Sequence, residues 1–189
     1  MSKGKEYGSL VIRDAMIVNG KGTPPYGPCD ILVEKGKIKQ IQNVDSISLA
    51  RYKNKRQEAD HVIEAKGMYV TPGLVDMHVH INIADDKCGP KGTEYAYNLF
   101  LAHGITTIRT CGFNTDEKLL EHKRLSERNE ITAPRIVVLG SWPVEVHSVE
   151  EARIAVRKLK EMGVDGIKSI PRPHVTSEMV EAMADEVRK

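Results

Sequence analysis

Cysteine and aromatic residues are scarce in this sequence, and each scarcity excludes a class of protein. Cys29, Cys88 and Cys111 are odd in number and widely spaced, so they suggest no disulfide framework and fit a reducing compartment. Aromatic residues make up only 5% of the chain, the formal net charge is +2, and Lys and Arg are scattered. The sequence therefore predicts neither a stacking platform nor a basic groove for nucleic acid.

Long hydrophobic runs are also missing. The first six residues contain no apolar segment of the kind found in a signal peptide, and no later run approaches the length of a membrane span. We therefore expect a cytoplasmic protein that does not bind a membrane.

What is present is an ordinary globular composition, 40% hydrophobic and 29% charged over 189 residues. Residues 1–66 contain short β-type runs separated by turn signals, such as Lys35-Gly36 between the runs 30–34 and 37–41. They predict a small antiparallel β-sheet domain, an incomplete β-sandwich-like unit.

Residues 67–189 alternate strands with helices, which is typical of βα units around a parallel sheet. Ser148 and Glu151 form a capping box for one of these helices, and Gly163 ends it. The fold class predicted for this region is α/β, a partial (β/α)8 TIM-type barrel of about four βα units. A complete barrel takes about 250 residues, so we expect only the N-terminal half of such a domain. The predicted strands are 74–81, 105–111, 135–139 and 166–170.

The predicted helices carry apolar residues at helical spacing, and these residues are expected to face the core. They are Ala96, Leu99, Phe100 and His103 in the first helix, Ala152, Ala155, Val156 and Leu159 in the capped helix, and Val180, Met183, Ala184 and Val187 in the last.

The stretch 71–81 carries the strongest chemical signal. From Asp76 onward every second residue is polar and those between are apolar, so a strand would carry Asp76, His78 and His80 on one face. Two histidines at this spacing can present ring nitrogens to one divalent cation. A bare His-x-His is also found as a hydrogen-bonded core pair. The preceding Pro72-Gly73 and the strand context favour the metal site.

Lys168 stands alone in the apolar strand 166–170. An unpaired ammonium is costly to bury, and burial lowers the pKa of a lysine. A neutral amine can react with carbon dioxide to form a carbamate, which is an anionic ligand with two oxygens. The other interpretation is a lysine that extends its charged end to solvent, and the spacing alone does not choose between the two.

Residues 72–80, PGLVDMHVH, resemble the first barrel strand of the metal-dependent amidohydrolase superfamily, most of all its imidazolonepropionase- and prolidase-like branch. Residues 62–70 resemble the entry into that strand, residues 104–109 the second strand, and residues 163–168 the fourth. The resemblance covers the chain from about Leu10 to its end. One departure is Thr110, where the family often has an aspartate after the arginine.

The resemblance implies hydrolysis of an amide or other C–N bond, of dipeptide or cyclic amide type, by a metal-activated hydroxide. It implies two divalent ions, zinc in the complete enzyme, with His78 and His80 as ligands and a carboxylated Lys168 as the bridge. The family's general-base aspartate belongs to the eighth strand and is expected beyond Lys189. The catalytic residue is therefore unknown, and we expect this fragment alone to be inactive.

Three further residues are candidates for contact with a small-molecule substrate. Arg109 lies on a predicted strand, while His147 and His174 follow the third and fourth strands, on the side where barrel sites form. A truncated barrel is also expected to form a homo-oligomer or to associate with a missing C-terminal half. Two alternatives stay open: a non-catalytic amidohydrolase-like scaffold that acts by assembly or binding, and a mononuclear deaminase of the same superfamily.

Overall fold

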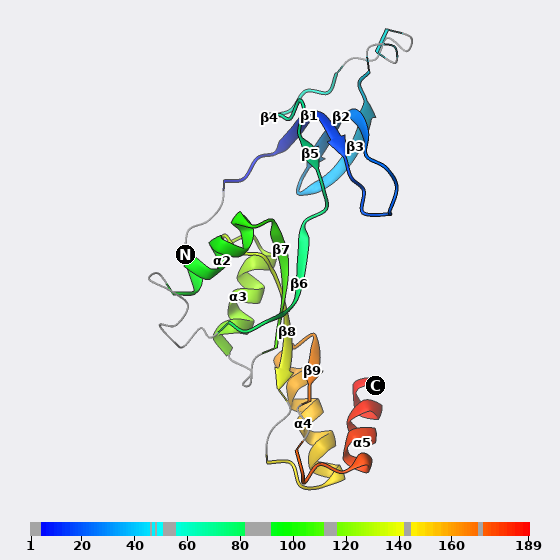
Figure 1. The fold of residues 1–189 in the computed structure, drawn as a ribbon. Helices are drawn as coiled ribbons and strands as arrows, with labels where there is room; N and C mark the ends of the chain where they lie inside the picture. The colour runs from blue at the N-terminus through cyan, green and yellow to red at the C-terminus, as the bar shows by residue number, and fades with distance from the viewer. Residues whose placement is uncertain are drawn as a thin grey trace. The chain divides into compact units, whose positions relative to one another are not determined.

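The computed structural model describes residues 5–45, 47, 49–50, 56–81, 92–111, 117–141, 145–169 and 172–189 (Figure 1). The chain forms two compact units, residues 5–72 and residues 73–189. Cys29 and Cys111 are buried free thiols, while Cys88 lies outside the described residues. Among the helices described, none has the length and apolarity to cross a membrane.

The first unit is a small five-stranded sheet in the order β3-β2-β1-β4, with β5 also paired to β1. The hairpin predicted at Lys35-Gly36 is confirmed, with Glu34 opposite Lys37 and φ values of 49° and 72° at the two turn residues. The strands are β1 (Ser9–Ile17), β2 (Tyr26–Glu34), β3 (Lys37–Asn43), β4 (His61–Glu64) and β5 (Tyr69–Val70).

The prediction of a purely antiparallel sheet is wrong in one respect. The pairs β1–β2 and β2–β3 are antiparallel, but β4 and β5 run parallel to β1. A tight hairpin forces antiparallel pairing, whereas the long connection between β3 and β4 leaves either direction open. The sheet is therefore mixed.

A buried carboxylate holds this sheet to the segment that precedes β4. Asp30 is fully buried and accepts hydrogen bonds from Arg56 Nε at 2.9 Å, from Arg56 Nη2 at 2.7 Å and from the Asp14 backbone N–H at 3.1 Å. Asp14 also pairs with Arg56 Nη2, at 3.1 Å. The hydrogen bond to Asp30 is the main reason why the pKa of Arg56 is raised above its usual value. The buried charge is thus compensated on several sides.

Replacing Asp30 with alanine is expected to destabilise the protein by about 3 kcal/mol, because it leaves Arg56 and the Asp14 N–H without their buried acceptor. Urea unfolding measures the change. Asp30→Asn keeps the shape and part of the hydrogen bonding, so its loss should be smaller. Equal stability of the alanine variant and the parent would contradict this account of the ion pair.

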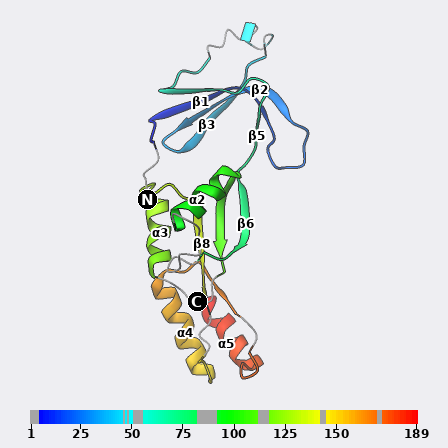
Figure 2. The same ribbon diagram turned by 60° about the vertical axis from the view of Figure 1, so that its left-hand side comes forward.

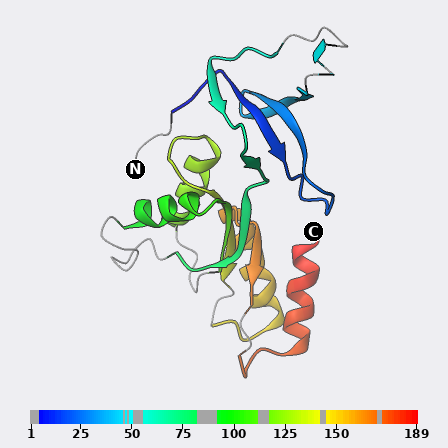
Figure 3. The same cartoon turned by 45° about the horizontal axis from the view of Figure 1, so that its top comes forward.

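The second unit contains four parallel strands in the order β6-β7-β8-β9, each followed by a helix. Its core lies between the sheet and the first two helices and includes Tyr97, Ile108, Ile136 and Val138. The predicted partial TIM-type barrel is confirmed, and we call this unit the half-barrel. Its elements are β6 (Leu74–Val79), α2 (Thr93–Ala102), β7 (Ile105–Thr110), α3 (Glu117–Glu127), β8 (Arg135–Ser141), α4 (Val149–Met162), β9 (Gly166–Lys168) and α5 (Ser177–Val187). Figure 3 shows β8 and β9 side by side.

Local signals account well for α4. The Ser148 side chain accepts a hydrogen bond from the Glu151 backbone N–H at 3.2 Å, and Gly163 ends the helix at φ 88°. The predicted face of Ala152, Ala155, Val156 and Leu159 is buried. The cap, the terminal glycine and the buried face are thus as predicted, but the capping box is only half formed, because Glu151 Oε2 accepts from the His147 backbone N–H rather than from that of Ser148.

The predicted faces of α2 and α5 are only partly right. Phe100 and Met183 pack against hydrophobic clusters of this unit as predicted, but other members of these faces are exposed. The buried residue of α2 is Tyr97, while Leu99 is 42% exposed. In α5 the buried residues are Met179, Ala182 and Glu186, while Val180 and Val187 are exposed. Apolar spacing identifies a helix, but the neighbouring elements decide which of its faces is covered.

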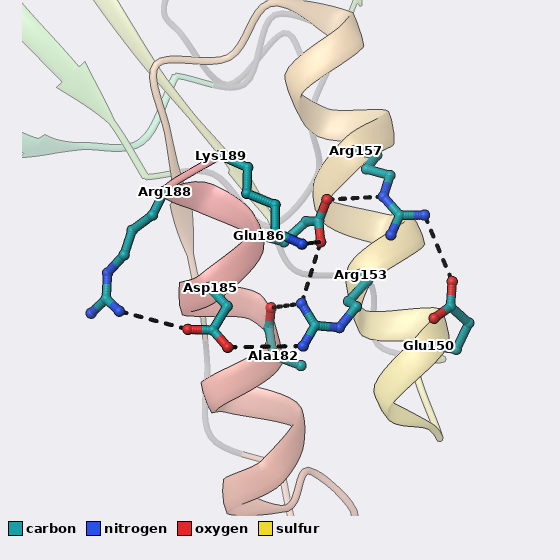
Figure 4. A network of polar contacts seen from close by, with 8 residues as sticks. All are labelled: Glu150, Arg153, Arg157, Ala182, Asp185, Glu186, Arg188 and Lys189. Carbon is teal, nitrogen blue, oxygen red and sulfur yellow. Dashed lines mark hydrogen bonds and ion pairs between the residues drawn. The ribbon is translucent and has the colours of Figure 1, made fainter.

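An ionic network joins α5 to α4 (Figure 4). Glu186, which is only 8% exposed, accepts hydrogen bonds from Arg157 Nε at 2.9 Å and from Arg153 Nη1 at 3.3 Å. Arg153 Nη1 also donates to the Ala182 carbonyl oxygen at 3.3 Å. The two helices consequently pack side by side, as Figures 1 and 2 show.

Because of this network, the stability of the protein should depend on pH in the acidic range. The Arg157 hydrogen bond, with a further one from Lys189, lowers the pKa of Glu186 from its usual 4.5 to about 2, against the opposing effect of burial. Between these two pH values the unfolded chain binds more protons than the folded one. The stabilisation from Glu186 is therefore complete above pH 4.5 and is lost as pH falls toward 2.

We expect Glu186→Gln to flatten the pH dependence of unfolding in this window. The measurement is chemical unfolding at several pH values, compared with Glu181→Gln, which removes an exposed carboxylate from the same helix. A parallel pH profile for the parent and Glu186→Gln would show that the contact is not formed in solution.

Candidate metal centre

Strand β6 positions the two histidines predicted as metal ligands. The expected alternation holds only in part: Val79 is buried in the core while His78 and His80, the latter just past the strand, are exposed. Val75 and Met77, which the same alternation places on the buried face, are more than half exposed. The two Nε2 atoms are 3.2 Å apart. Asp76 Oδ1 accepts a hydrogen bond from the His78 backbone N–H at 3.1 Å, which fixes the strand next to the imidazole.

The close approach of β6 to the start of β7 explains why a glycine precedes β6. A Cβ atom at Gly73 would overlap the Thr106 side chain, so β6 can approach the start of β7 this closely only without a side chain there. The Leu74 backbone N–H then donates to the Gly104 carbonyl oxygen at 2.8 Å.

Lys168, the last residue of β9, reaches the same place. Its Nζ donates to the Cys111 carbonyl oxygen at 3.0 Å and lies 3.5 Å from His78 Nε2. In a flat sheet, strands at positions one and four would lie about 14 Å apart. The contact between Lys168 and His78 therefore reflects the curl of the sheet, which brings the strand ends together on the inner face.

The geometry of the histidine pair suits a tetrahedral ion. With zinc–nitrogen distances of 2.0–2.1 Å, two ligand nitrogens of a tetrahedral site lie about 3.3 Å apart, close to the observed 3.2 Å. Among the described residues, no group of three or more His, Cys, Asp or Glu could hold a metal. The third member of this set is Lys168, which can serve as a ligand only as a neutral amine or a carbamate.

Hydrogen bonds from β7 and the residue after it hold the backbone of β6 in place beside these side chains. The Arg109 Nε donates to the Met77 carbonyl oxygen at 2.8 Å, and the Cys111 backbone N–H donates to the Val79 carbonyl oxygen at 2.8 Å. The role of the Cys111 carbonyl as the acceptor for Lys168 had no signal in the sequence, because every residue has a carbonyl and only the curled sheet brings this one to the lysine.

The other two predicted candidates, His147 and His174, contact each other. His147 lies just before α4 and His174 just before α5, and their ring centroids are 4.9 Å apart. The predicted site residues thus form two groups. One contains His78, His80 and Lys168, with Arg109 beside them. The other is the contact between His147 and His174.

Comparison with known proteins decides the family. The sequence profile of the Amidohydrolase family matches residues 69–189, which is more than half of the chain. The chain belongs to the amidohydrolase family. The resemblance seen in the sequence is thereby confirmed.

The relatives of this amidohydrolase family member are longer proteins. A dihydroorotase from Caldanaerobacter subterraneus subsp. tengcongensis is 30% identical over 164 residues, which are 82% of this chain and 33% of that protein. An imidazolonepropionase from Salmonella arizonae is 25% identical over 165 residues, 80% of this chain and 38% of that protein. The chain thus spans about a third of the length of the curated relatives it matches.

A solved structure shows the same fold. A Xaa-Pro dipeptidase with methionine bound in its active site superposes with a TM-score of 0.68 at 20% identity. The superposition covers 95% of this chain and 54% of that one. The chain therefore shares its fold with about half of that longer protein.

Proposed function

We propose that the protein is a metal-dependent hydrolase that cleaves an amide or other C–N bond in a small molecule of dipeptide or cyclic amide type. The observation that carries the proposal is the convergence of His78, His80 and Lys168 where the parallel strands end. In TIM-type barrels the reacting groups lie at this end. Membership of the amidohydrolase family supports the same chemistry.

In this proposal His78 and His80 hold a divalent ion, zinc, and a carboxylated Lys168 supplies oxygens that bridge to a second one. Such ions, when bound, polarise a substrate carbonyl and lower the pKa of a bound water to near neutrality. Asp76 and Arg109 position the pair, since both bind the backbone of β6 next to His78. Carboxylation joins the neutral Lys168 amine to carbon dioxide and releases one proton.

Arg109 and the histidines 147 and 174 are our candidates for substrate contact. Arg109 is the better placed of the three, because its guanidinium lies beside the backbone that carries His78. Its planar donors match a substrate carboxylate. A substrate with a free carboxylate, such as a dipeptide, would use this feature.

The proposal is tested by metal-dependent turnover of the whole protein. The purified protein is stripped with a chelator, reloaded with zinc in bicarbonate buffer, and assayed against a panel of dipeptides and cyclic amides. Turnover that disappears with the chelator and returns with zinc is the expected result. Zinc bound at the histidine pair without turnover of any substrate would favour a non-catalytic scaffold, and deamination of an amino-substituted ring would favour the deaminase alternative.

Residues 1–189 by themselves should show little of this activity. Their described candidate ligands are two imidazoles and one lysine, and the general-base aspartate expected on an eighth barrel strand is not among the four strands described. Groups that act as a catalytic unit lose most of their rate when one is missing. The comparison is between purified residues 1–189 and the longest natural form of the protein, and equal turnover would contradict the expectation.

Association is the second expectation for residues 1–189. The apolar residues Leu74, Val75 and Met77 of β6 are each more than half exposed, and β6 is an end strand of the sheet. An uncovered strand edge with apolar side chains favours pairing with a second copy or with further barrel segments. Analytical ultracentrifugation at several protein concentrations measures this association.

A further inference from the structure

The loop that follows β1 carries the asparagine–glycine pair Asn19-Gly20. In such a pair the backbone nitrogen of the glycine can attack the side-chain amide of the asparagine, because no glycine side chain shields that nitrogen. Gly20 is exposed and has a φ of 73°, which a residue with a side chain rarely adopts. The turn therefore requires the same glycine that leaves the nitrogen accessible.

Two donors hold the side-chain carbonyl of Asn19. Its Oδ1 accepts hydrogen bonds from the Lys21 backbone N–H at 2.9 Å and from the Thr23 hydroxyl at 3.2 Å. When a nucleophile attacks the amide carbon, negative charge develops on this oxygen, and donors that are already in place stabilise it. The turn thus polarises the Asn19 amide as an oxyanion hole polarises a substrate carbonyl.

Asn43 is the closest match to Asn19 among the described asparagines, and the difference between them lies in the next residue. The Asn43 Oδ1 also accepts a hydrogen bond from the N–H two positions on, at 3.3 Å. However, Val44 is buried and its N–H donates to the Pro28 carbonyl oxygen at 3.0 Å. The Gly20 N–H makes no hydrogen bond to any described residue. Only the nitrogen after Asn19 is therefore available for attack.

The two remaining described asparagines resemble Asn43 in this respect. Asn98 lies inside α2, where the next N–H belongs to the hydrogen-bonded helix. Asn129 is followed by Glu130, whose N–H donates to the Leu125 carbonyl oxygen at 2.8 Å. A nitrogen engaged in this way has to break a hydrogen bond before it can react, which adds to the barrier.

We propose that Asn19 is a site of spontaneous covalent modification, which converts it to aspartate and isoaspartate through a cyclic imide. The Gly20 nitrogen loses its proton and forms a bond to the side-chain carbonyl carbon of Asn19. The bond from that carbon to Nδ2 breaks, and ammonia leaves. Water then adds to one of the two ring carbonyls: opening at one gives aspartate, and opening at the other gives isoaspartate. Water is the co-reactant.

The modification changes the loop in charge and in shape. A carboxylate replaces a neutral amide, and in the isoaspartyl form the backbone runs through the side-chain carbon and is one atom longer. A Cβ atom at Gly20 would lie 3.4 Å from the Pro72 side chain, so the altered turn lies beside the residue that precedes β6 by two positions. The isoaspartyl form also carries a free α-carboxylate, the group that an isoaspartyl carboxyl methyltransferase methylates. The proposal does not depend on the hydrolytic function proposed above.

The test compares the folded protein with an unfolded reference. Purified residues 1–189 and a synthetic peptide of residues 14–25 are incubated side by side at neutral pH and physiological temperature. Mass spectrometry of the tryptic peptide 14–21 should show conversion of amide to acid at least as fast in the folded protein as in the free peptide, because the fold keeps both donors on Asn19 Oδ1. Asn43 in the same digest is the internal control and should stay an amide. Methylation by an isoaspartyl methyltransferase measures the isoaspartyl product.

Two variants of Thr23 separate the effect of the turn from the effect of the dipeptide alone. Thr23→Val removes one donor to Asn19 Oδ1 and should slow the conversion about fivefold, whereas Thr23→Ser keeps the hydroxyl and should match the parent. Thr23 is exposed, so neither change should affect folding. Conversion that is much slower in the folded protein than in the peptide would overturn the proposal, as would equal rates in Thr23→Val and the parent.

Discussion

Replacing His78 with alanine should lower metal-dependent turnover of the whole protein by about a thousandfold or more, because it removes a ligand and leaves the ion without a fixed position. His78 is the central member of its set: its Nε2 lies 3.2 Å from His80 Nε2 and 3.5 Å from Lys168 Nζ. The variant should also lose bound zinc as measured by elemental analysis. His80→Ala should behave in the same way.

The control for this prediction is His61→Ala. His61 belongs to the small sheet, where its ring stacks on Tyr7 at 4.3 Å between centroids, and its loss should leave both zinc content and turnover within about twofold of the parent. Full activity of a folded, zinc-free His78→Ala protein would remove the basis of the proposed function.

Replacing Lys168 with arginine is expected to lower turnover by about a hundredfold or more, because a guanidinium stays protonated and cannot form a carbamate. Arginine can still donate a hydrogen bond to the Cys111 carbonyl, the contact that Lys168 makes at 3.0 Å. The substitution therefore separates the two interpretations of this lysine. A lysine that only ties β9 to the end of β7 would be replaced by arginine with little loss.

The carbamate itself can be observed directly. The parent protein, loaded with zinc in ¹³C-labelled bicarbonate, should show a carbamate carbon signal that is absent from Lys168→Arg. The variant Lys168→Ala should regain part of its turnover when a short carboxylic acid is added, since the added carboxylate can occupy the place of the carbamate. Normal turnover of Lys168→Arg, or a parent protein without the carbon signal, would mean that Lys168 is no bridging ligand.

The order and type of the half-barrel elements could be predicted from local patterns. In α4 the capping residue Ser148, the terminal Gly163 and the apolar spacing all act within a few residues of each other, and all three predictions are confirmed. The faces of α2 and α5 could be predicted only in part, since Phe100 and Met183 do pack against the hydrophobic clusters. Leu99 and Val180 have the right spacing for a core position, yet the buried residues are Tyr97 in α2 and Met179, Ala182 and Glu186 in α5.

Local sequence patterns likewise could not predict the direction of β4 relative to β1. A two-residue turn such as Lys35-Gly36 determines the pairing of its own strands, but residues 44–60 are long enough to return the chain in either direction. The pairing of β4 with β1, in register from Leu10 opposite His61, is settled by contacts between residues about fifty positions apart.

The sequence by itself determined the strand period that places His78 and His80 on one face, and it singled out Lys168 as an ionisable residue in an apolar run. These residues come together only in the tertiary structure. His78 and Lys168 are 90 positions apart in the sequence, and they approach each other because the sheet of four parallel strands curls. The same applies to the Cys111 carbonyl and to the pair of His147 and His174. Local spacing determines which way a side chain points from its own strand or loop, whereas the packing of the whole sheet determines which other side chain it meets.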